Sequence, residues 1–97
     1  MSKLLQVFLS DDASNVSVSE VSIDTDTDRL TCTCPGFKGR NTCKHAREVE
    51  ARIRAFGGVY PMEFTDRVDE EELVAAISGG EDMLRQFVLK YGKVDVL

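Results

Sequence analysis

Three cysteines and one histidine are the residues of this chain best suited to chemistry. All four fall in the 14-residue segment from position 32 to position 45, and they are Cys32, Cys34, Cys43 and His45. An odd number of thiols cannot all pair as disulfides within one chain, and two cysteines one residue apart bridge each other only with strain. Three thiolates and one imidazole are instead a complete ligand set for tetrahedral zinc, with no coordination position left open. The sequence therefore predicts one structural Zn²⁺.

Strands are expected before the first two cysteines. Residues 4–9 form an almost unbroken apolar run, which predicts a buried strand, and the polar residues 11–15 predict a turn after it. Residues 16–18 and 21–23 then alternate between apolar and polar side chains in opposite parity. This change of parity predicts a bulge or bend at residues 19–20.

A further short strand is expected to carry the first two ligands. The polar residues 24–28 predict a turn before it. Three side chains then share one face: Leu30, Cys32 and Cys34. The Pro-Gly pair at residues 35–36 predicts a turn directly after this strand, because Pro fixes one dihedral angle and Gly frees the next. The residues between the second and third cysteines are expected to form the loop that closes the tetrahedron.

A helix is expected after this loop, with the other two ligands at its start. Asn41 or Thr42 can cap the helix, and the Gly pair at residues 57–58 ends it. Four apolar residues recur between these ends at helical spacing: Ala46, Val49, Ile53 and Phe56. Unpaired backbone N–H groups and the helix dipole favour a thiolate at such a start, which suits Cys43 in the first turn.

The last third of the chain predicts two further helices. Asp69 and Glu72 resemble a helix-start pair, and the Gly pair at residues 79–80 breaks the first helix before Glu81 and Asp82 begin the second. Their apolar faces would hold Leu73, Val74, Ala76, Ile77, Met83, Leu84, Phe87, Val88 and Tyr91. Two short helices need something to cover such faces, so we expect a helical hairpin that packs on the finger.

These elements predict a small α+β fold. It consists of a short antiparallel β-sheet, a zinc-stabilised β-β-α finger and a C-terminal helical hairpin, with residues 1–58 and 59–97 as its two parts in one compact unit. The length of 97 residues leaves room for one domain, and 42% hydrophobic with 30% charged residues is typical of a globular protein. No apolar run approaches the roughly 20 residues of a membrane span, and no secretory signal is expected at the start.

The spacing of the ligands resembles that of the SWIM-type zinc finger. The pattern is Cys-x-Cys, eight residues, then Cys-x-His, and the likeness extends to Pro35, the loop aromatic Phe37 and Lys44. It covers roughly residues 16–57 and implies a β-β-α fold. The ligands that it implies are Cys32, Cys34, Cys43 and His45. Members of the family are associated with DNA binding and with protein–protein contacts, so the resemblance is specific for fold and metal and weak for function.

The segment that holds the finger is basic although the whole chain is acidic. The chain has 12 Lys and Arg against 17 Asp and Glu, a net charge of −5. Residues 37–54 hold six cations and two anions, a net of +4, so the remainder carries −9. The acidic total argues against unspecific coating of nucleic acid, but it leaves room for one basic face. The candidate contact residues for nucleic acid or another partner are Phe37, Lys38, Arg40, Lys44, Arg47 and Arg54.

Three explanations of this basic segment stay open. In the first, the helix and the zinc loop follow a phosphate backbone, and Phe37 stacks on a base. In the second, the cations compensate the charge of −1 that three thiolates leave on Zn²⁺, or meet the acidic residues 69–72 within the molecule, while Phe37 fills the small core. In the third, the partner is an acidic protein.

Catalysis is the function least compatible with this sequence. The metal uses the only histidine and every cysteine, so no histidine-assisted nucleophile can be built, and no Gly-rich phosphate loop is present. We expect a non-catalytic zinc protein that acts as a nucleic-acid- or protein-binding adaptor or regulator. We expect neither a membrane nor a small-molecule substrate as its partner.

The alternative function is a purely structural finger in a small protein–protein interaction protein, for example a phage or viral accessory factor, with no nucleic-acid binding. The partner would then meet the hairpin, its acidic face, or the apolar residues Val59, Tyr60, Met62 and Phe64. Zinc-bound thiols predict a reducing intracellular compartment, which is the cytoplasm, or the nucleus in a eukaryote.

Overall fold

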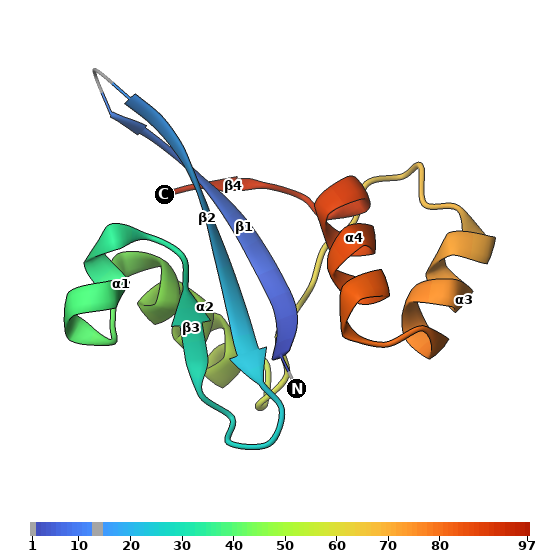
Figure 1. Ribbon diagram of the computed structural model, residues 1–97, viewed down its shortest axis with the longest axis horizontal. Coiled ribbons are helices and arrows are strands. Elements are labelled where there is room, and N and C mark those ends of the chain that lie inside the picture. The colour runs from blue at the N-terminus through green and yellow to red at the C-terminus, as the bar shows by residue number, and fades with distance from the viewer. Residues whose placement is uncertain (1, 13–14) are drawn as a thin grey trace.

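A four-stranded sheet of order β3-β2-β1-β4 lies at the centre of the fold (Figure 1). The computed structural model describes residues 2–12 and 15–97. The strands are β1 (Ser2–Asp12), β2 (Asn15–Asp24), β3 (Leu30–Cys32) and β4 (Asp95–Val96). The helices are α1 (Pro35–Arg40), α2 (Lys44–Ala55), α3 (Glu70–Ser78) and α4 (Glu81–Tyr91). The predicted α+β class is confirmed, with the three expected parts in the expected order.

The long hairpin of β1 and β2 differs in detail from the prediction. Its ladder runs from the pair Ser2–Asp24 to the pair Asp12–Asn15, so both strands extend into the expected turn, whose residues 13–14 lie outside the described residues. The bulge expected at residues 19–20 is wrong, because β2 is continuous and the register shifts instead on β1, between Leu4 and Gln6.

The change of parity in β2 reflects the two faces of the sheet. Neighbouring residues of a regular strand point to opposite faces, so Val16 and Val18 lie on the face opposite to Val21. Val21 is fully buried, whereas Val16 and Val18 are 66% and 60% exposed. When the apolar residues of a regular strand lie on one face near one end and on the opposite face near the other end, its sequence pattern is the same as that of a strand with a bulge.

Helices cover both faces of β1. On one face α2 packs through Val49 against a core that includes Leu5 and Phe8. On the other face α4 packs through Val88 against Leu4 and Val7. The side-chain alternation of this one strand therefore serves both the finger and the C-terminal hairpin. The boundary between residues 58 and 59 stays a prediction.

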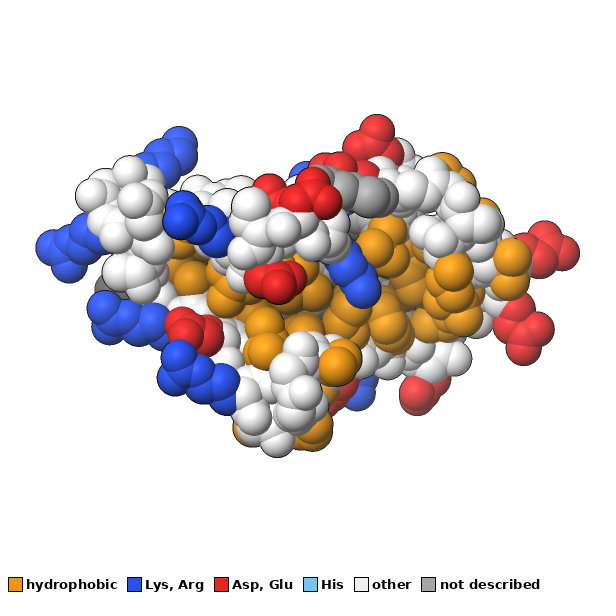
Figure 2. Space-filling view, turned by 90° about the horizontal axis from the view of Figure 1, so that it is seen from below, with side chains coloured by type: hydrophobic (Ala, Val, Ile, Leu, Met, Phe, Trp, Pro, Cys, Tyr) orange, Lys and Arg blue, Asp and Glu red, His pale blue; other side chains and the backbone are white. Residues whose placement is uncertain are grey.

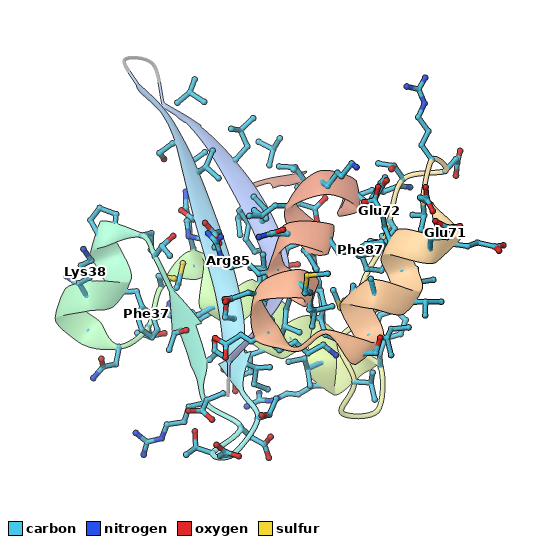
Figure 3. The ribbon with its side chains drawn as sticks, turned by 45° about the vertical axis from the view of Figure 1, so that its right-hand side comes forward. Phe37, Lys38, Glu71, Glu72, Arg85 and Phe87 are labelled. Carbon is cyan, nitrogen blue, oxygen red and sulfur yellow. The ribbon has the colours of Figure 1, made fainter. Side chains whose placement is uncertain are left out.

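The C-terminal helices form the expected hairpin. Asp69 caps α3 by accepting hydrogen bonds from the backbone N–H groups of Glu71 and Glu72, at 2.8 and 3.4 Å. Phe87 of α4 lies between the two helices (Figure 3), in a core shared with Ala76 and Tyr91. The expected apolar faces are only partly buried. Three of their members are exposed: Val74, Ile77 and Met83.

Two elements were not expected from the sequence. The loop between the second and third cysteines folds into the short helix α1, with Pro35 at its first position, where the missing N–H group costs nothing. Asn41, with a φ of 55°, ends this helix in the left-handed region. The second element is β4, whose two residues pair in parallel with β1. None of the helices described is long and apolar enough to cross a bilayer.

Candidate metal centre

The four predicted ligands come together from three elements of the fold. Cys32 ends β3, Cys34 is the N-cap of α1, Cys43 is the N-cap of α2, and His45 lies in the first turn of α2. Their three sulfur atoms and one ring nitrogen all lie within 4.8 Å of one another. Ligands from three chain segments converge at one point, so a bound ion would tie the sheet to both helices.

The cap of α2 differs from the prediction that Asn41 or Thr42 begins the helix. The Sγ atom of Cys43 itself accepts a hydrogen bond from the backbone N–H of Ala46, at 3.4 Å. A thiolate is a better acceptor than a thiol, and the helix dipole favours negative charge at this end. The residue that binds the metal thus also begins the helix.

The distances within the cluster fit zinc. Nδ1 of His45 lies 3.9 Å from Sγ of Cys32 and 3.9 Å from Sγ of Cys43. A tetrahedral ion with Zn–S bonds of about 2.3 Å and a Zn–N bond of about 2.0 Å separates its ligand atoms by about 3.5–3.8 Å. The two Nδ1–Sγ distances match this geometry within a few tenths of an ångström, and the three sulfurs and one nitrogen of the cluster fit a single structural Zn²⁺.

The protonation of the thiols shows why the cluster needs a cation. Burial raises the pKa of Cys32 to about 12. Burial acts in the same direction on Cys34, but hydrogen bonds from the Cys43 thiol and from backbone N–H groups outweigh it and lower the pKa of Cys34. Burial therefore opposes the ionisation of Cys32 and Cys34, and a divalent cation would supply the charge that lets the thiols ionise together.

The fourth ligand is prepared as a neutral base. Burial lowers the pKa of His45, which favours the unprotonated ring that a metal requires. The imidazole is 3% exposed and packs on the ring of Phe8, with 5.3 Å between the ring centroids.

Two neighbours of His45 were missed by the sequence reasoning. They are Ser10 on β1 and Leu97 beyond β4, which both contact Nε2 of the ring. The only signal for Ser10 is a small polar residue that closes an apolar strand, and Leu97 has none because it approaches from 52 positions away.

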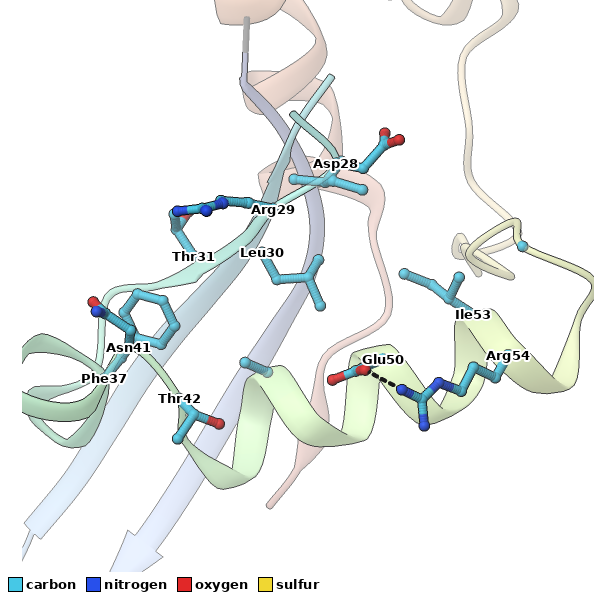
Figure 4. Close-up of a pocket in the computed structure, with 13 residues that line it drawn as sticks. Asp28, Arg29, Leu30, Thr31, Phe37, Asn41, Thr42, Glu50, Ile53 and Arg54 are labelled. Carbon is cyan, nitrogen blue, oxygen red and sulfur yellow. Dashed lines mark hydrogen bonds and ion pairs between the residues drawn. The ribbon is translucent and has the colours of Figure 1, made fainter. Parts of the chain in front are cut away.

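The predicted contact residues lie around two different grooves. Arg40, Lys44 and Arg47 line a groove of about 630 Å³ beside the metal ligands, and Lys38 is exposed on α1 nearby (Figure 3). Phe37 and Arg54 line a separate groove of about 790 Å³ between β3 and α2 (Figure 4).

The last two of these residues have partners within the chain. Phe37 is half-buried and packs against the core of the finger. Arg54 forms an ion pair with Glu50 at 2.5 Å, shown as a dashed line in Figure 4. Whether any of the six residues contacts a partner stays a prediction.

The charges of the molecule are separated along its length. Most blue Lys and Arg side chains in Figure 2 gather at the end that holds α1, and acidic side chains project from the end that holds α3. Lys38 and Glu71 lie at these opposite ends in Figure 3. The expected contact between residues 69–72 and the basic segment is therefore wrong, and Glu72 pairs instead with Lys90 of α4, at 2.8 Å.

Comparison with known proteins agrees with this geometry. The family model of the SWIM zinc finger matches residues 6–47, a segment that includes all four ligands. This match begins ten residues before the resemblance seen in the sequence and ends in the first turns of α2. No curated protein and no solved structure matches the chain. With its four ligands gathered into one zinc-binding cluster, the segment of residues 6–47 is a SWIM zinc finger.

Proposed function

We propose that this chain is a zinc-stabilised adaptor whose finger binds the phosphate backbone of a nucleic acid. A SWIM zinc finger is a binding module and not a catalytic one, which supports an adaptor or regulatory role. The surface that would carry the contact is the basic face, which we define as Lys38, Arg40, Lys44 and Arg47. The reducing interior of a cell, either cytoplasm or nucleus, is the environment that suits such a thiolate-rich site.

The observation that carries this proposal is the lack of internal partners for the basic face. None of its four cations forms an ion pair with a described residue, whereas five other cations do. Those five are Arg52, Arg54, Arg85, Lys90 and Lys93. Lys3, Arg29 and Arg67 also form no ion pair with a described residue. The basic face differs because three of its cations line one groove and the fourth lies nearby, so positive charge is available for a partner there.

The groove beside the basic face has the composition of a phosphate contact. The exposed Ser17 lines its wall on the sheet side beside the buried Ser10 and Ser19, and three of the cations line the helix side. Serine hydroxyls with Lys and Arg are among the groups that most often contact phosphate oxygens in nucleic-acid complexes.

Fluorescence anisotropy with labelled single- and double-stranded DNA over a series of salt concentrations tests the proposal. The double variant Lys44→Ala/Arg47→Ala should weaken binding and reduce the slope of log K against log salt by about 1.4–1.8, because each phosphate contact contributes about 0.7–0.9. The control is Lys3→Ala/Arg67→Ala, which removes the same charge from two exposed positions outside the basic face and should leave the slope unchanged.

The same variants separate this function from charge compensation at the metal. If the cations only balance the thiolates, Lys44→Ala/Arg47→Ala lowers zinc affinity, and the protein binds no DNA at low salt. That result would refute the proposal. The remaining candidate would be a structural finger with a protein partner on the hairpin, which the exposure of Val74 (63%) and Ile77 (74%) on α3 favours. Val59 is also exposed, but Tyr60 is buried and Met62 and Phe64 pack against the cores.

A further inference from the structure

The two ring nitrogens of His45 face different partners. Nδ1 faces the sulfur ligands, 3.9 Å from Sγ of Cys32 and of Cys43. Nε2 lies 3.2 Å from Oγ of Ser10 and 3.2 Å from the main-chain oxygen of Leu97. A neutral imidazole that binds metal through Nδ1 carries its proton on Nε2. Nε2 is then a donor that points at two oxygen atoms.

The hydroxyl of Ser10 is oriented so that its oxygen can accept a hydrogen bond from Nε2 of His45. It donates its own proton to the main-chain oxygen of Leu97 at 2.6 Å, which leaves its lone pairs free for the ring of His45. Both Ser10 and His45 are buried, at 8% and 3% exposure. The three groups form a closed set in which each donated proton has an acceptor, and a buried N–H without one would be unfavourable.

The oxygen of Leu97 is held in place by the strand that precedes it. The backbone N–H of Leu97 donates to the carbonyl of Leu9 at 3.0 Å, and the side chain of Leu97 packs against the core of the finger. Two further contacts fasten the same segment. Arg52 donates to Asp95 at 2.6 Å, and Gln6 donates through Nε2 to the carbonyl of Lys93 at 2.7 Å.

We propose that Ser10 and the segment of residues 93–97 belong to the zinc site as positioning residues. They fix the tautomer and the orientation of His45, so that zinc binding and the docking of β4 stabilise each other. Because such a coupling is reciprocal, anything that displaces the C-terminal segment weakens the metal site, and loss of the metal loosens the segment. This inference rests on the metal centre and does not depend on nucleic-acid binding.

Two variants of the full chain test the inference through zinc affinity, measured by competition with a chromophoric chelator. A chain that ends at Asp95 removes the oxygen of Leu97 but keeps the ion pair with Arg52, and it should bind zinc about 10- to 100-fold more weakly. Ser10→Ala keeps that oxygen and should lose about 3- to 10-fold. Ser22→Ala is the matched control, since the described contacts of His45 Nε2 are with Ser10 and Leu97, and it should match the unmodified chain.

A spectroscopic readout separates positioning from a general loss of stability. In the zinc-loaded protein the Nε2–H proton of His45 should give a slowly exchanging NMR signal, and this signal should exchange faster in both variants. Co²⁺ spectra should retain the bands of three-sulfur, one-nitrogen ligation, because all four ligands are still present. Zinc affinity within about twofold of the unmodified chain in both variants, or an unchanged Nε2–H signal, would overturn the inference.

Discussion

Arg52 of α2 and Asp95 of β4 form an ion pair, with 2.6 Å between Nη1 and Oδ2. The same guanidinium donates to the hydroxyl of Tyr60 at 3.0 Å and to Glu48 at 3.1 Å, and it lies 5.6 Å from the ring centroid of Phe8. Burial acts to lower the pKa of Arg52, but these hydrogen bonds outweigh it and raise the pKa above its ordinary value. One side chain thus joins the finger helix, the connection that follows it and the last strand.

Replacing Arg52 by Met should destabilise the zinc-loaded protein by about 1–2 kcal/mol. Three polar partners lose their donor, and at 30% side-chain exposure water compensates only part of the loss. The control is Arg54→Met, whose pair with Glu50 is on the surface with the arginine side chain 78% exposed, and which should cost less than about 0.5 kcal/mol. Urea unfolding at a fixed free zinc concentration measures both, and equal losses would contradict the role given to Arg52.

Ionisation of Tyr60 should lower the free energy of unfolding at alkaline pH. Its hydroxyl donates to Oε1 of Gln6 at 2.7 Å, and burial raises its pKa, although the hydrogen bond from Arg52 acts against this shift. A raised pKa in the folded state means a contribution that is complete below the ordinary value of about 10 and is lost as the pH rises through the higher folded-state value.

Tyr60→Phe tests this contribution. The variant should lose about 1–3 kcal/mol at neutral pH, because Oε1 of the buried Gln6 loses its donor. The gap in stability between the variant and the unmodified chain should close above pH 10, where the tyrosine itself ionises. A gap that stays constant from pH 7 to pH 11 would show that the hydroxyl does not titrate as proposed.

Much of the metal site could be predicted because its information is local. Four ligands within 14 residues and the Gly pair at residues 57–58 are patterns of nearby residues, and they predicted the ligand set and the end of α2. The hairpin at the C-terminus followed in the same way from Asp69 and the Gly pair at residues 79–80, since Gly80 adopts a φ of 89°. The Pro-Gly pair was misread, because it begins α1 where a turn was expected, and β3 ends at Cys32 and not at Cys34.

The rest depends on contacts between distant segments. β4 has only two residues and forms because β1 offers a free edge, so no pattern in its own sequence marks it. Ser10 and Leu97 meet His45 from 35 and 52 positions away. The parity of β2 was misread as a bulge because the sequence does not show which face a helix covers at each end.

Val49 should be the most sensitive apolar position of the finger helix. It is fully buried between α2 and the sheet, so Val49→Ala leaves a cavity and should cost about 2 kcal/mol. Val74→Ala on α3 makes the same change at a side chain that is 63% exposed, and it should cost less than about 0.5 kcal/mol. Thermal melting of both variants with zinc in excess checks the difference, and a large loss for Val74→Ala would show that this side chain is covered in solution.

Removing zinc should unfold the finger. Binding to such a site contributes on the order of 10 kcal/mol, which is comparable to the whole stability of a small domain. The ligands come from β3 and from the starts of α1 and α2, so without the cation these elements lose the link that, in addition to a helix cap and the packing of one core, joins them. Far-ultraviolet circular dichroism during a chelator titration, with zinc measured by elemental analysis, should show metal and structure lost together.

Cys32→Ser provides the matching substitution, because a hydroxyl is a poor zinc ligand at the position where burial most strongly holds the proton. Thr31→Ser, one residue earlier and exposed, is its control and should retain one zinc per chain. The finger and the C-terminal helical hairpin pack on opposite faces of β1, so the loss of zinc should also lower the melting temperature of the C-terminal helices. If the chelator left both the spectrum and the melting temperature unchanged and no zinc were present, the metal would have no part in this fold.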